Sequence, residues 1–270
     1  MGSHTGHSIA RSCILRIAAG TDYDAAGASS DLARAPHKQL AAKAIVFEMD
    51  NVLHDATVWR RWLVRVLAHL GVTIDYRTFY RAWDHDYLPQ VFSGRRDFEE
   101  AFQGFLLESG LTWQVIDELE GASRIWRVAM EADVRPLPQV ASTLARLTAA
   151  NLPLAILANS AQTASCLSER LMRMKLHSHF SAVISSLDLE AAKPSSACYH
   201  AALAAIGCSA SEAVYVGYDK DALAGAAAVG MQTVGFNHQE DAQADELLSR
   251  FDELLDVVDC GARQNWRKAS

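Results

Sequence analysis

The 270-residue sequence predicts an α/β fold in which a Rossmann-like parallel sheet core carries an inserted helical cap domain. Three observations lead to this prediction. The apolar segment AAKAIVFEMD at residues 41–50 ends in acidic residues and has the length of a buried parallel strand. Strand-like and helix-like segments alternate between residues 139 and 236, as they do in βαβ units. The section between these two parts has helical periodicity only.

The composition argues against several classes of protein. Half of the residues are hydrophobic, which provides a full-sized core and is atypical of a disordered chain. The net charge of −7 comes without a cluster of Lys and Arg, so we expect no nucleic-acid partner. We expect no membrane partner, because no apolar stretch approaches the roughly 20 residues of a membrane span. Five scattered cysteines without CxxC spacing indicate a reducing compartment, and we expect a cytoplasmic protein.

The patterns divide the chain into four parts. A flexible N-terminal extension rich in Ser, Ala and Gly is followed by the α/β core, which the helical cap interrupts, and by a short tail. We expect these parts at residues 1–38, 39–57 with 134–258, 58–133 and 259–270, respectively.

The cap section is expected to form a small helical bundle. The segment VWRRWLVRVLAHLG at residues 58–71 has one apolar stripe at helical spacing, made of Trp59, Trp62, Leu63, Val66, Leu67 and Leu70. Five of the six tryptophans lie in the cap section. We expect them to fill the core of the bundle, with one or two available to face a substrate cleft.

The core elements follow one another in strict alternation after Pro136 and Pro138, which end the helical section. We expect helices at residues 139–151, 163–176, 195–207 and 221–230, and strands at residues 152–160, 180–186, 212–217 and 231–236. The acidic segment at 238–256 is expected to form a solvated amphipathic helix. Ligands of such sheets bind at the carboxyl ends of the strands.

Polar residues follow four of the predicted strands. They are Glu48 and Asp50, Asn159 and Ser160, Lys193 with Pro194, and Asp219 and Asp221.

These strand ends, with the segments around them, resemble the motifs of the haloacid dehalogenase superfamily. The resemblance covers residues 43–238 and rests on VFEMDNVL, VRPLPQVASTLARLTAANLPLAILANS, HFSAVISSLDLEAAKPSSACYHAALAAIG and EAVYVGYDKDALAGAAAVGMQTVGF. It points to the branch of phosphatase-like and dehalogenase-like proteins whose helical cap follows the first motif. The resemblance implies a Rossmann-like core and Mg²⁺-dependent hydrolysis of a phosphate monoester, with a small phosphorylated metabolite as the substrate.

The resemblance also implies a role for each motif. The first acid of the first motif attacks phosphorus, and the second acid protonates the leaving oxygen and then activates water. A hydroxyl residue and a lysine hold the transferred group, and acids of the fourth motif help to bind Mg²⁺.

Residue by residue, the implied catalytic set is Glu48, Asp50 and Lys193. The implied substrate-binding residues are Asn159 and Ser160 together with Lys193, and the implied metal ligands are Glu48, Asp50 and Asp219. Asn51 stands where the family has a small Gly, and Asn tolerates a left-handed backbone.

Four positions depart from the family pattern. Glu48 replaces the attacking Asp, and its extra methylene shifts the carboxylate by about 1.5 Å, which in-line attack tolerates poorly. Ala158 replaces the hydroxyl residue, a loss comparable to that of one oxyanion donor, roughly 2.7–4 kcal/mol. Tyr218 and Ala222 replace two carboxylates on the metal side. Mg²⁺ relies on few protein anions, so we expect these losses to weaken its binding.

The retained residues also have structural explanations. Lys193 suits a salt bridge to Glu48 or Asp50 that persists without catalysis. Asp219 and Asp221 suit a solvated turn or the N-terminus of a helix.

Two hypotheses therefore stay open. In the first, the chain keeps the hydrolase fold with little or no ordinary phosphatase activity and acts as a binding or regulatory module. In the second, it is an active hydrolase on a small metabolite that uses Glu48, Asp50 and Lys193. The second hypothesis favours a phosphatase over a 2-haloacid dehalogenase, which needs no metal but wants an Asp nucleophile. The sequence leaves open whether the protein is a monomer or a homodimer.

Overall fold

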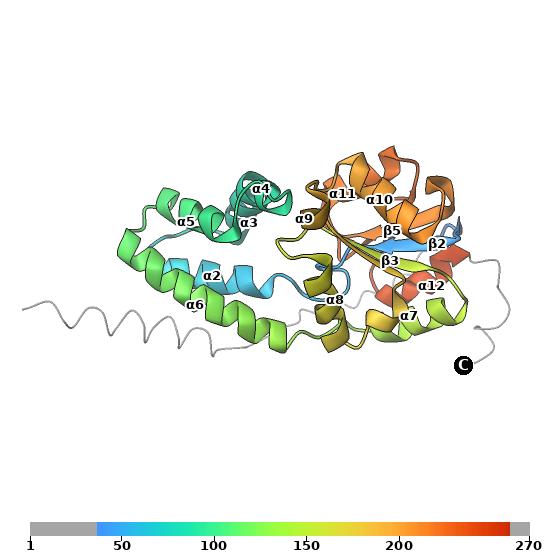
Figure 1. Ribbon diagram of the computed structural model, residues 1–270, viewed down its shortest axis with the longest axis horizontal. Coiled ribbons are helices and arrows are strands. Elements are labelled where there is room, and N and C mark those ends of the chain that lie inside the picture. Colours follow the sequence, from blue (N-terminus) through green and yellow to red (C-terminus); the bar gives the residue numbers. More distant parts are fainter. Residues whose placement is uncertain (1–36, 260–270) are drawn as a thin grey trace, which may run out of the picture. The chain divides into compact units, whose positions relative to one another are not determined.

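A computed structural model describes residues 37–259 of the chain (Figure 1). The expected N-terminal extension and C-terminal tail lie almost wholly outside the described residues. The described residues group into two compact units. One unit contains Thr57–Pro89 and Arg96–Asp133, and the other contains residues 37–56, 90–95 and 134–259.

The second unit is built on a six-stranded sheet in the order β4-β3-β2-β5-β6-β7. Every neighbouring pair of strands is parallel, so the predicted Rossmann-like parallel core is confirmed. A separate parallel pair joins β1 to β8. The strands are β1 (Leu40–Ala41), β2 (Ala44–Phe47), β3 (Leu154–Ala158), β4 (Ala182–Ser185), β5 (Ala213–Gly217), β6 (Gln232–Phe236), β7 (Glu246–Leu248) and β8 (Val258–Asp259).

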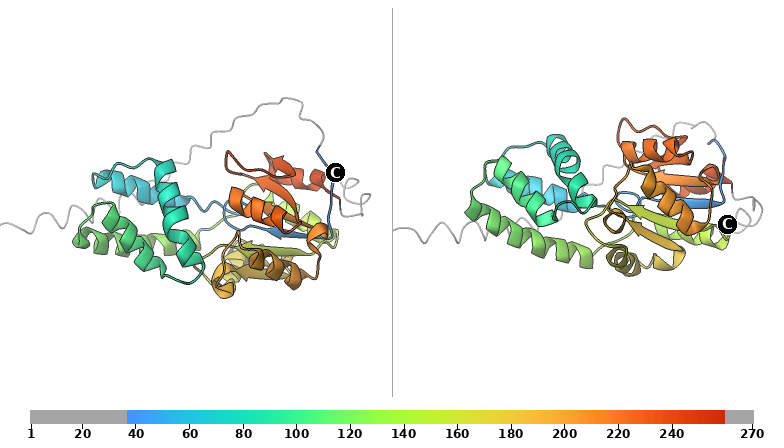
Figure 2. Two further views of the ribbon diagram at one scale, coloured as in Figure 1. Left: turned by 90° about the horizontal axis from the view of Figure 1, so that it is seen from above. Right: turned by 45° about the horizontal axis from the view of Figure 1, so that its top comes forward.

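Helices cover both faces of this sheet (Figure 2). Along β2, Ile45 and Phe47 join a core cluster with α7, α8 and α12, whereas Val46 joins a cluster with α10 and α11. This alternation follows from the period of two residues in a strand, which turns successive side chains to opposite faces. The helices of this unit are α7 (Val140–Ala149), α8 (Ala164–Arg173), α9 (Ser186–Leu189), α10 (Ser196–Ile206), α11 (Lys220–Ala228) and α12 (Leu254–Val257).

The prediction of one amphipathic helix at residues 238–256 is wrong. Strand β7 and the short α12 occupy the end of this segment. Leu248 pairs with Phe236 of β6, and both Leu248 and Leu254 are buried. The apolar residues at helical spacing are explained by two separate contacts with the sheet, which local periodicity does not distinguish from one helix.

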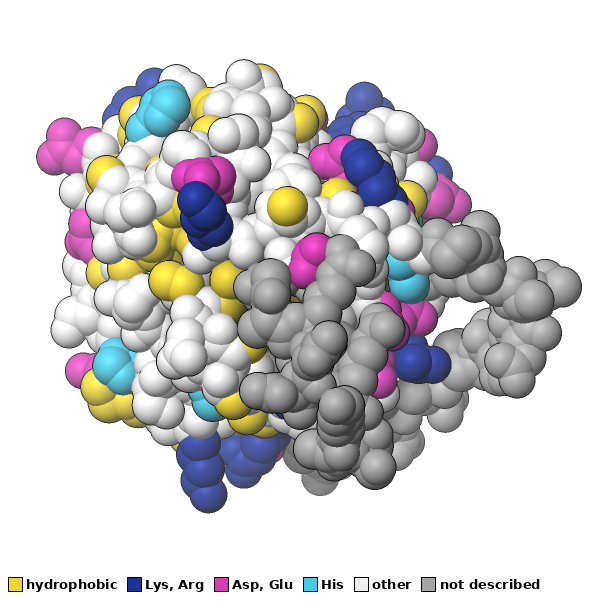
Figure 3. All heavy atoms as spheres, turned by 90° about the vertical axis from the view of Figure 1, so that its right-hand side faces the viewer, with side chains coloured by type: hydrophobic (Ala, Val, Ile, Leu, Met, Phe, Trp, Pro, Cys, Tyr) yellow, Lys and Arg dark blue, Asp and Glu magenta, His cyan; other side chains and the backbone are white. Residues whose placement is uncertain are grey.

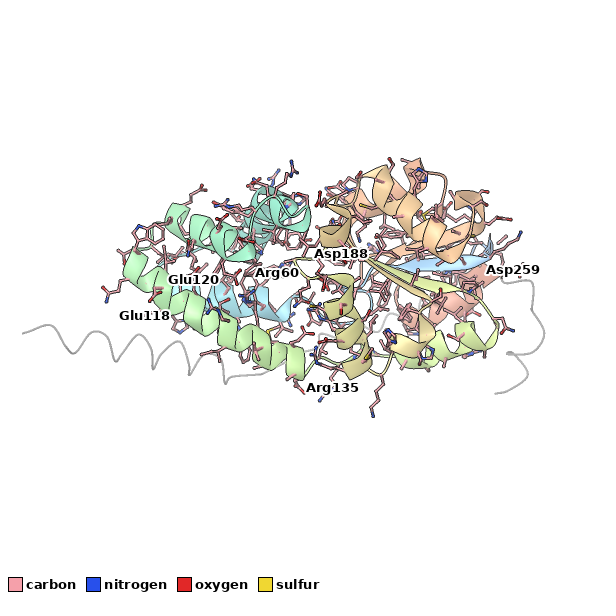
Figure 4. The ribbon with its side chains drawn as sticks, viewed as in Figure 1. Arg60, Glu118, Glu120, Arg135, Asp188 and Asp259 are labelled. Carbon is pink, nitrogen blue, oxygen red and sulfur yellow. The ribbon has the colours of Figure 1, made fainter. Side chains whose placement is uncertain are left out.

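The other unit consists of helices, as the periodicity of the cap section predicts. Its elements are α2 (Val58–His69), α3 (Tyr76–Arg81), a one-turn π-helix η1 (Ala82–Tyr87), α5 (Phe98–Glu108) and α6 (Trp113–Ala132). Helix α4 (Leu88–Phe92) is divided between the two units. Arg60 on α2, labelled in Figure 4, donates to Asp84 Oδ1 through Nη2 at 2.8 Å and through Nε at 3.1 Å.

An aromatic cluster fills the interior of the helical unit. Trp83 has 1 % of its surface exposed, and five other aromatic rings have their centroids within 6.0 Å of its own, namely Trp59, Tyr87, Phe98, Phe102 and Phe105. The expectation that tryptophans fill the bundle core holds for Trp59, Trp62 and Trp83, which are buried. Trp113 is 62 % exposed and does not belong to this core.

The surface supplies two further observations. Basic side chains on the face shown in Figure 3 are interspersed with acidic, apolar and uncharged groups. Among residues 37–259, none of the helices combines the length and the apolar character that a membrane crossing requires.

We predict that Trp83→Ala lowers the free energy of unfolding by about 3–5 kcal/mol, because the surrounding rings cannot close the cavity. Trp113→Ala is the matched control, and we expect it to change stability by only about 0.5 kcal/mol. Urea denaturation followed by tryptophan fluorescence and far-UV circular dichroism measures both. Equal losses in the two variants would contradict the aromatic core.

Candidate active site

The candidate site lies at the carboxyl ends of β2, β3 and β5. Because these strands are parallel and in register, Phe47 at the end of β2 lies beside Ile156 and Val216. Glu48 extends the ladder by donating its N–H to the Val216 carbonyl at 2.9 Å. The residues that follow the three strands therefore meet at one edge of the sheet.

Lys193 reaches this edge from the loop that precedes α10, and 1 % of its side chain is exposed. Its ammonium group donates to Glu48 Oε1 at 2.8 Å, to the Leu157 carbonyl at 3.1 Å and to Tyr215 Oη at 2.9 Å. An ammonium group carries three hydrogens, so these three acceptors satisfy it. The salt bridge between Lys193 and Glu48, one of the two pairings considered from the sequence, is confirmed.

The second oxygen of Glu48 is also engaged. Glu48 Oε2 accepts the backbone N–H of Tyr218 at 2.9 Å and that of Asp219 at 3.3 Å. The loop after β5 thus directs two peptide N–H groups at the carboxylate. Both oxygens of this buried acid are bonded to protein donors, as a charge removed from water requires.

Tyr215, the third acceptor of Lys193, is buried. Burial, reinforced by the negative charge of Glu48, raises the pKa of Tyr215 well above its usual value, so the phenol keeps its proton. The ring packs edge-on against Tyr199 at 5.7 Å between centroids. A Cβ atom at Gly217 would lie 2.6 Å from the Tyr215 ring, so a residue without a side chain is needed there.

Asp50 has a different environment. Its side chain is 42 % exposed, and its Oδ1 lies 3.1 Å from His54 Nε2 and 3.8 Å from Arg170 Nη1. The His54 contact is close, but its alignment does not satisfy a hydrogen bond to Nε2. Asn51, which follows Asp50, has a φ of 59°, the left-handed conformation that the sequence suggested it could adopt.

The polar residues after β3 form hydrogen bonds with neighbouring groups of the protein. The Asn159 amide accepts the N–H of Lys193 at 2.8 Å and donates to the Lys193 carbonyl at 3.1 Å. The backbone N–H of Ser160 donates to Ser186 Oγ at 3.0 Å, and Ser160 Oγ accepts the N–H of Gln162 at 3.0 Å. Asn159 therefore positions the backbone of Lys193.

Asp219 caps helix α11. Its Oδ1 accepts the N–H of Ala222 at 2.9 Å, and its Oδ2 accepts Gln239 Nε2 at 3.2 Å. Asp221 lies in the first turn of the same helix. The structural explanation for these two acids, a helix N-terminus that favours negative charge, is confirmed.

Two of the three implied Mg²⁺ ligands, Glu48 and Asp219, are engaged by donors of the protein, so the described residues do not form a Mg²⁺ site as they stand. This ion prefers oxygen ligands in near-octahedral geometry. Both oxygens of Glu48 already accept hydrogen bonds, one of them from a cation, and both oxygens of Asp219 accept hydrogen bonds from the protein. Between residues 37 and 259, no group of three or more His, Cys, Asp or Glu side chains is arranged to hold a metal ion.

The sequence analysis missed three residues of this site. Tyr215 accepts from Lys193, Arg170 lies beside Asp50, and Gln239 bonds both Asp219 and the Tyr218 carbonyl. A tyrosine inside the apolar segment AVYVG was an available signal, because a buried phenol needs a polar partner. The sequence offers no comparable signal for Arg170 or Gln239, which come from a helix and a loop distant in the chain.

The chain is similar to several characterised proteins. A curated relative, the glyceraldehyde 3-phosphate phosphatase of Methanocaldococcus jannaschii, is 25% identical over 231 residues, which cover 80% of this chain and 96% of the relative. A solved dehalogenase superimposes with a TM-score of 0.61 at 23% identity, covering 79% of this chain and 96% of that one. The L-2-haloacid dehalogenase of Xanthobacter autotrophicus superimposes with a TM-score of 0.57 at 20% identity and the same coverage.

A family model also matches the chain. The model describes haloacid dehalogenase-like hydrolases and matches residues 96–236, which is more than half of the sequence. The parallel core and the inserted helical unit agree with this match. The chain therefore belongs to the haloacid dehalogenase-like hydrolase family.

Proposed function

We propose that this chain keeps the hydrolase fold without ordinary Mg²⁺-dependent phosphatase activity, and that it acts as a binding or regulatory module. One observation carries the proposal. The carboxylate of Glu48, at the position of the attacking acid, is bonded to Lys193 through one oxygen and to two backbone N–H groups through the other. In this proposal the centre of the site is a structural ion pair.

Attack on phosphorus requires a carboxylate oxygen that can approach the substrate in line. To do so, Glu48 would have to leave Lys193, whose side chain is buried, or the two N–H groups, which are partly buried. Breaking a buried ion pair costs several kcal/mol, because an uncompensated charge remains. This cost would be added to the barrier of the chemical step.

The donors that would hold a phosphate are also committed. Lys193 has three acceptors within the protein, and Ala158 supplies no hydroxyl. The side chain of Asn159 bonds the backbone of Lys193. A phosphate arriving here would have to displace protein partners from a buried lysine.

A second function, that of an active hydrolase using Glu48, Asp50 and Lys193, is favoured by the exposure of Asp50. Its carboxylate is 42 % exposed and lies 3.8 Å from the guanidinium of Arg170. An accessible carboxylate can serve as a general base, and the cation beside it can bind an anionic substrate. The phosphatase and dehalogenase activities named for the similar proteins define the substrates for a test.

We predict that the purified protein hydrolyses neither an aryl phosphate nor glyceraldehyde 3-phosphate faster with Mg²⁺ than without it. We also expect no chloride release from 2-chloropropionate, because Glu48 cannot reach carbon without breaking its ion pair. Phosphate and chloride release are measured for the wild type and for Glu48→Gln. Turnover that is present in the wild type and absent in Glu48→Gln would refute the non-catalytic proposal.

Restoring the family pattern provides the converse test. We predict that the combined variant Glu48→Asp, Ala158→Thr, Tyr218→Asp and Ala222→Asp gains Mg²⁺-dependent hydrolysis of an aryl phosphate. The shorter acid releases the lysine, and the other changes return a hydroxyl and two metal-side carboxylates. Adding Asp50→Asn to this variant is the control and should remove the gained activity. A folded but inactive variant would show that these four positions do not explain the lack of phosphatase activity.

If the ion pair has a structural role, its loss should destabilise the fold. Lys193→Met should lower the free energy of unfolding by about 3–5 kcal/mol, because the buried Glu48 carboxylate loses its counter-charge. Lys220→Met, which removes a half-exposed lysine 3.8 Å from Asp241, should cost less than about 1 kcal/mol. Adding Glu48→Gln to Lys193→Met should recover part of the loss. Urea denaturation measures all three, and equal losses for the two lysines would contradict the structural role.

A further inference from the structure

Helix α6 has two apolar faces. Its inner face packs into the helical unit through Ile116, Leu119 and Ser123, which are buried. On the opposite side of the same helix, Ile125 is 64 % exposed and Val128 is 67 % exposed. A helix at the surface of a single unit needs only one apolar stripe, so the outer stripe requires a separate explanation.

The outer stripe has the spacing of a helix–helix seam. Gly121, Ile125, Val128 and Ala132 are separated by four, three and four residues, which keeps them on one line when two helices wind around each other. Ala122 and Ala129 flank this line on one side. The small residues allow a second helix to approach closely, and the two branched residues supply the apolar contact. We name these six residues the α6 seam.

We propose that the α6 seam is a homodimer interface, in which α6 of a second copy packs antiparallel against it around a two-fold axis. In this register Ile125 opposes Val128 of the second copy, and Gly121 opposes Ala132. The two-fold axis repeats each contact, as in a self-complementary interface. The four layers span about 16 Å of helix.

The charges beside the seam select this arrangement. Arg124 and Glu131 lie on the flank opposite to Ala122 and Ala129, and the antiparallel register brings Arg124 of one copy beside Glu131 of the other, twice per dimer. A parallel register would instead oppose Glu118, which projects from α6 at the end of the seam (Figure 4), to its own copy. It would also leave Arg124 beside Ala129. Opposite charges flanking a helical seam determine partner and orientation in this way.

The seam is short, so we expect a dimer that dissociates on dilution. Sedimentation velocity over a concentration series should show the mass of the wild type rising from one chain to two. Ile125→Glu and Val128→Glu each place two carboxylates in the apolar seam of a dimer. We expect each change to weaken association by about a hundredfold or more.

Charge reversal tests the register. Arg124→Glu alone and Glu131→Arg alone should each weaken the dimer, because like charges then meet twice. The double variant should recover most of the wild-type association, because the pairs are restored with opposite polarity. Met172→Glu is the matched control, since Met172 is also an exposed apolar residue, on α8 at 55 % exposure, and it should leave association unchanged. Circular dichroism and thermal unfolding verify that each variant is folded.

Four results would overturn the proposal. A wild type that stays monomeric at all concentrations would do so, and a monomer destabilised by Ile125→Glu but not by Met172→Glu would indicate that another part of the same chain covers the seam. A dimer that persists in Ile125→Glu would place the interface elsewhere. Failure of the double charge variant to recover association would exclude the antiparallel register.

Discussion

The buried ion pair between Glu48 and Lys193 is the interaction on which the arrangement of the site depends. Moving two charges out of water is unfavourable, and such a pair is tolerated only when its remaining hydrogens and lone pairs find partners. Here the partners come from three neighbouring strands. Glu48 follows β2, the Leu157 carbonyl belongs to β3, and Tyr215 belongs to β5. The pair therefore links the centre of the sheet to the loop that carries Lys193.

The residues of the site are physically coupled. The longer acid at position 48 reaches both the ammonium group and the N–H groups after β5; an aspartate would withdraw its carboxylate by about 1.5 Å from them. Tyr215 supplies the third acceptor of Lys193, and its ring leaves room only for glycine at position 217. The proposed absence of phosphatase activity rests on these contacts, because phosphoryl transfer requires lysine and carboxylate groups that substrate and metal can use.

The helical unit shows a similar separation of roles on α6. Its inner face belongs to the aromatic and aliphatic interior, and its outer face carries the proposed seam, where small and branched residues lie in a line between alanines and charges. A helix that is apolar on two sides is stable in water when both sides are covered. For the non-catalytic protein that we propose, assembly through this seam would be a function that does not depend on turnover.

The sequence by itself determined the class of fold, the strands β2 to β6 and the helices α7, α8, α10 and α11, because apolar runs of strand length and helical periodicity are local properties. It also led us to expect departures from the family pattern at Glu48, Ala158, Tyr218 and Ala222, because motif spacing assigns those positions. The tertiary structure decided what the retained groups do. Asn159 bonds the backbone of Lys193, Asp219 caps the N-terminus of α11, and Tyr215 accepts from the buried ammonium group. Each of these choices depends on atoms brought together from distant parts of the chain, and hydrogen bonds in a buried site are assigned by that proximity and not by local sequence.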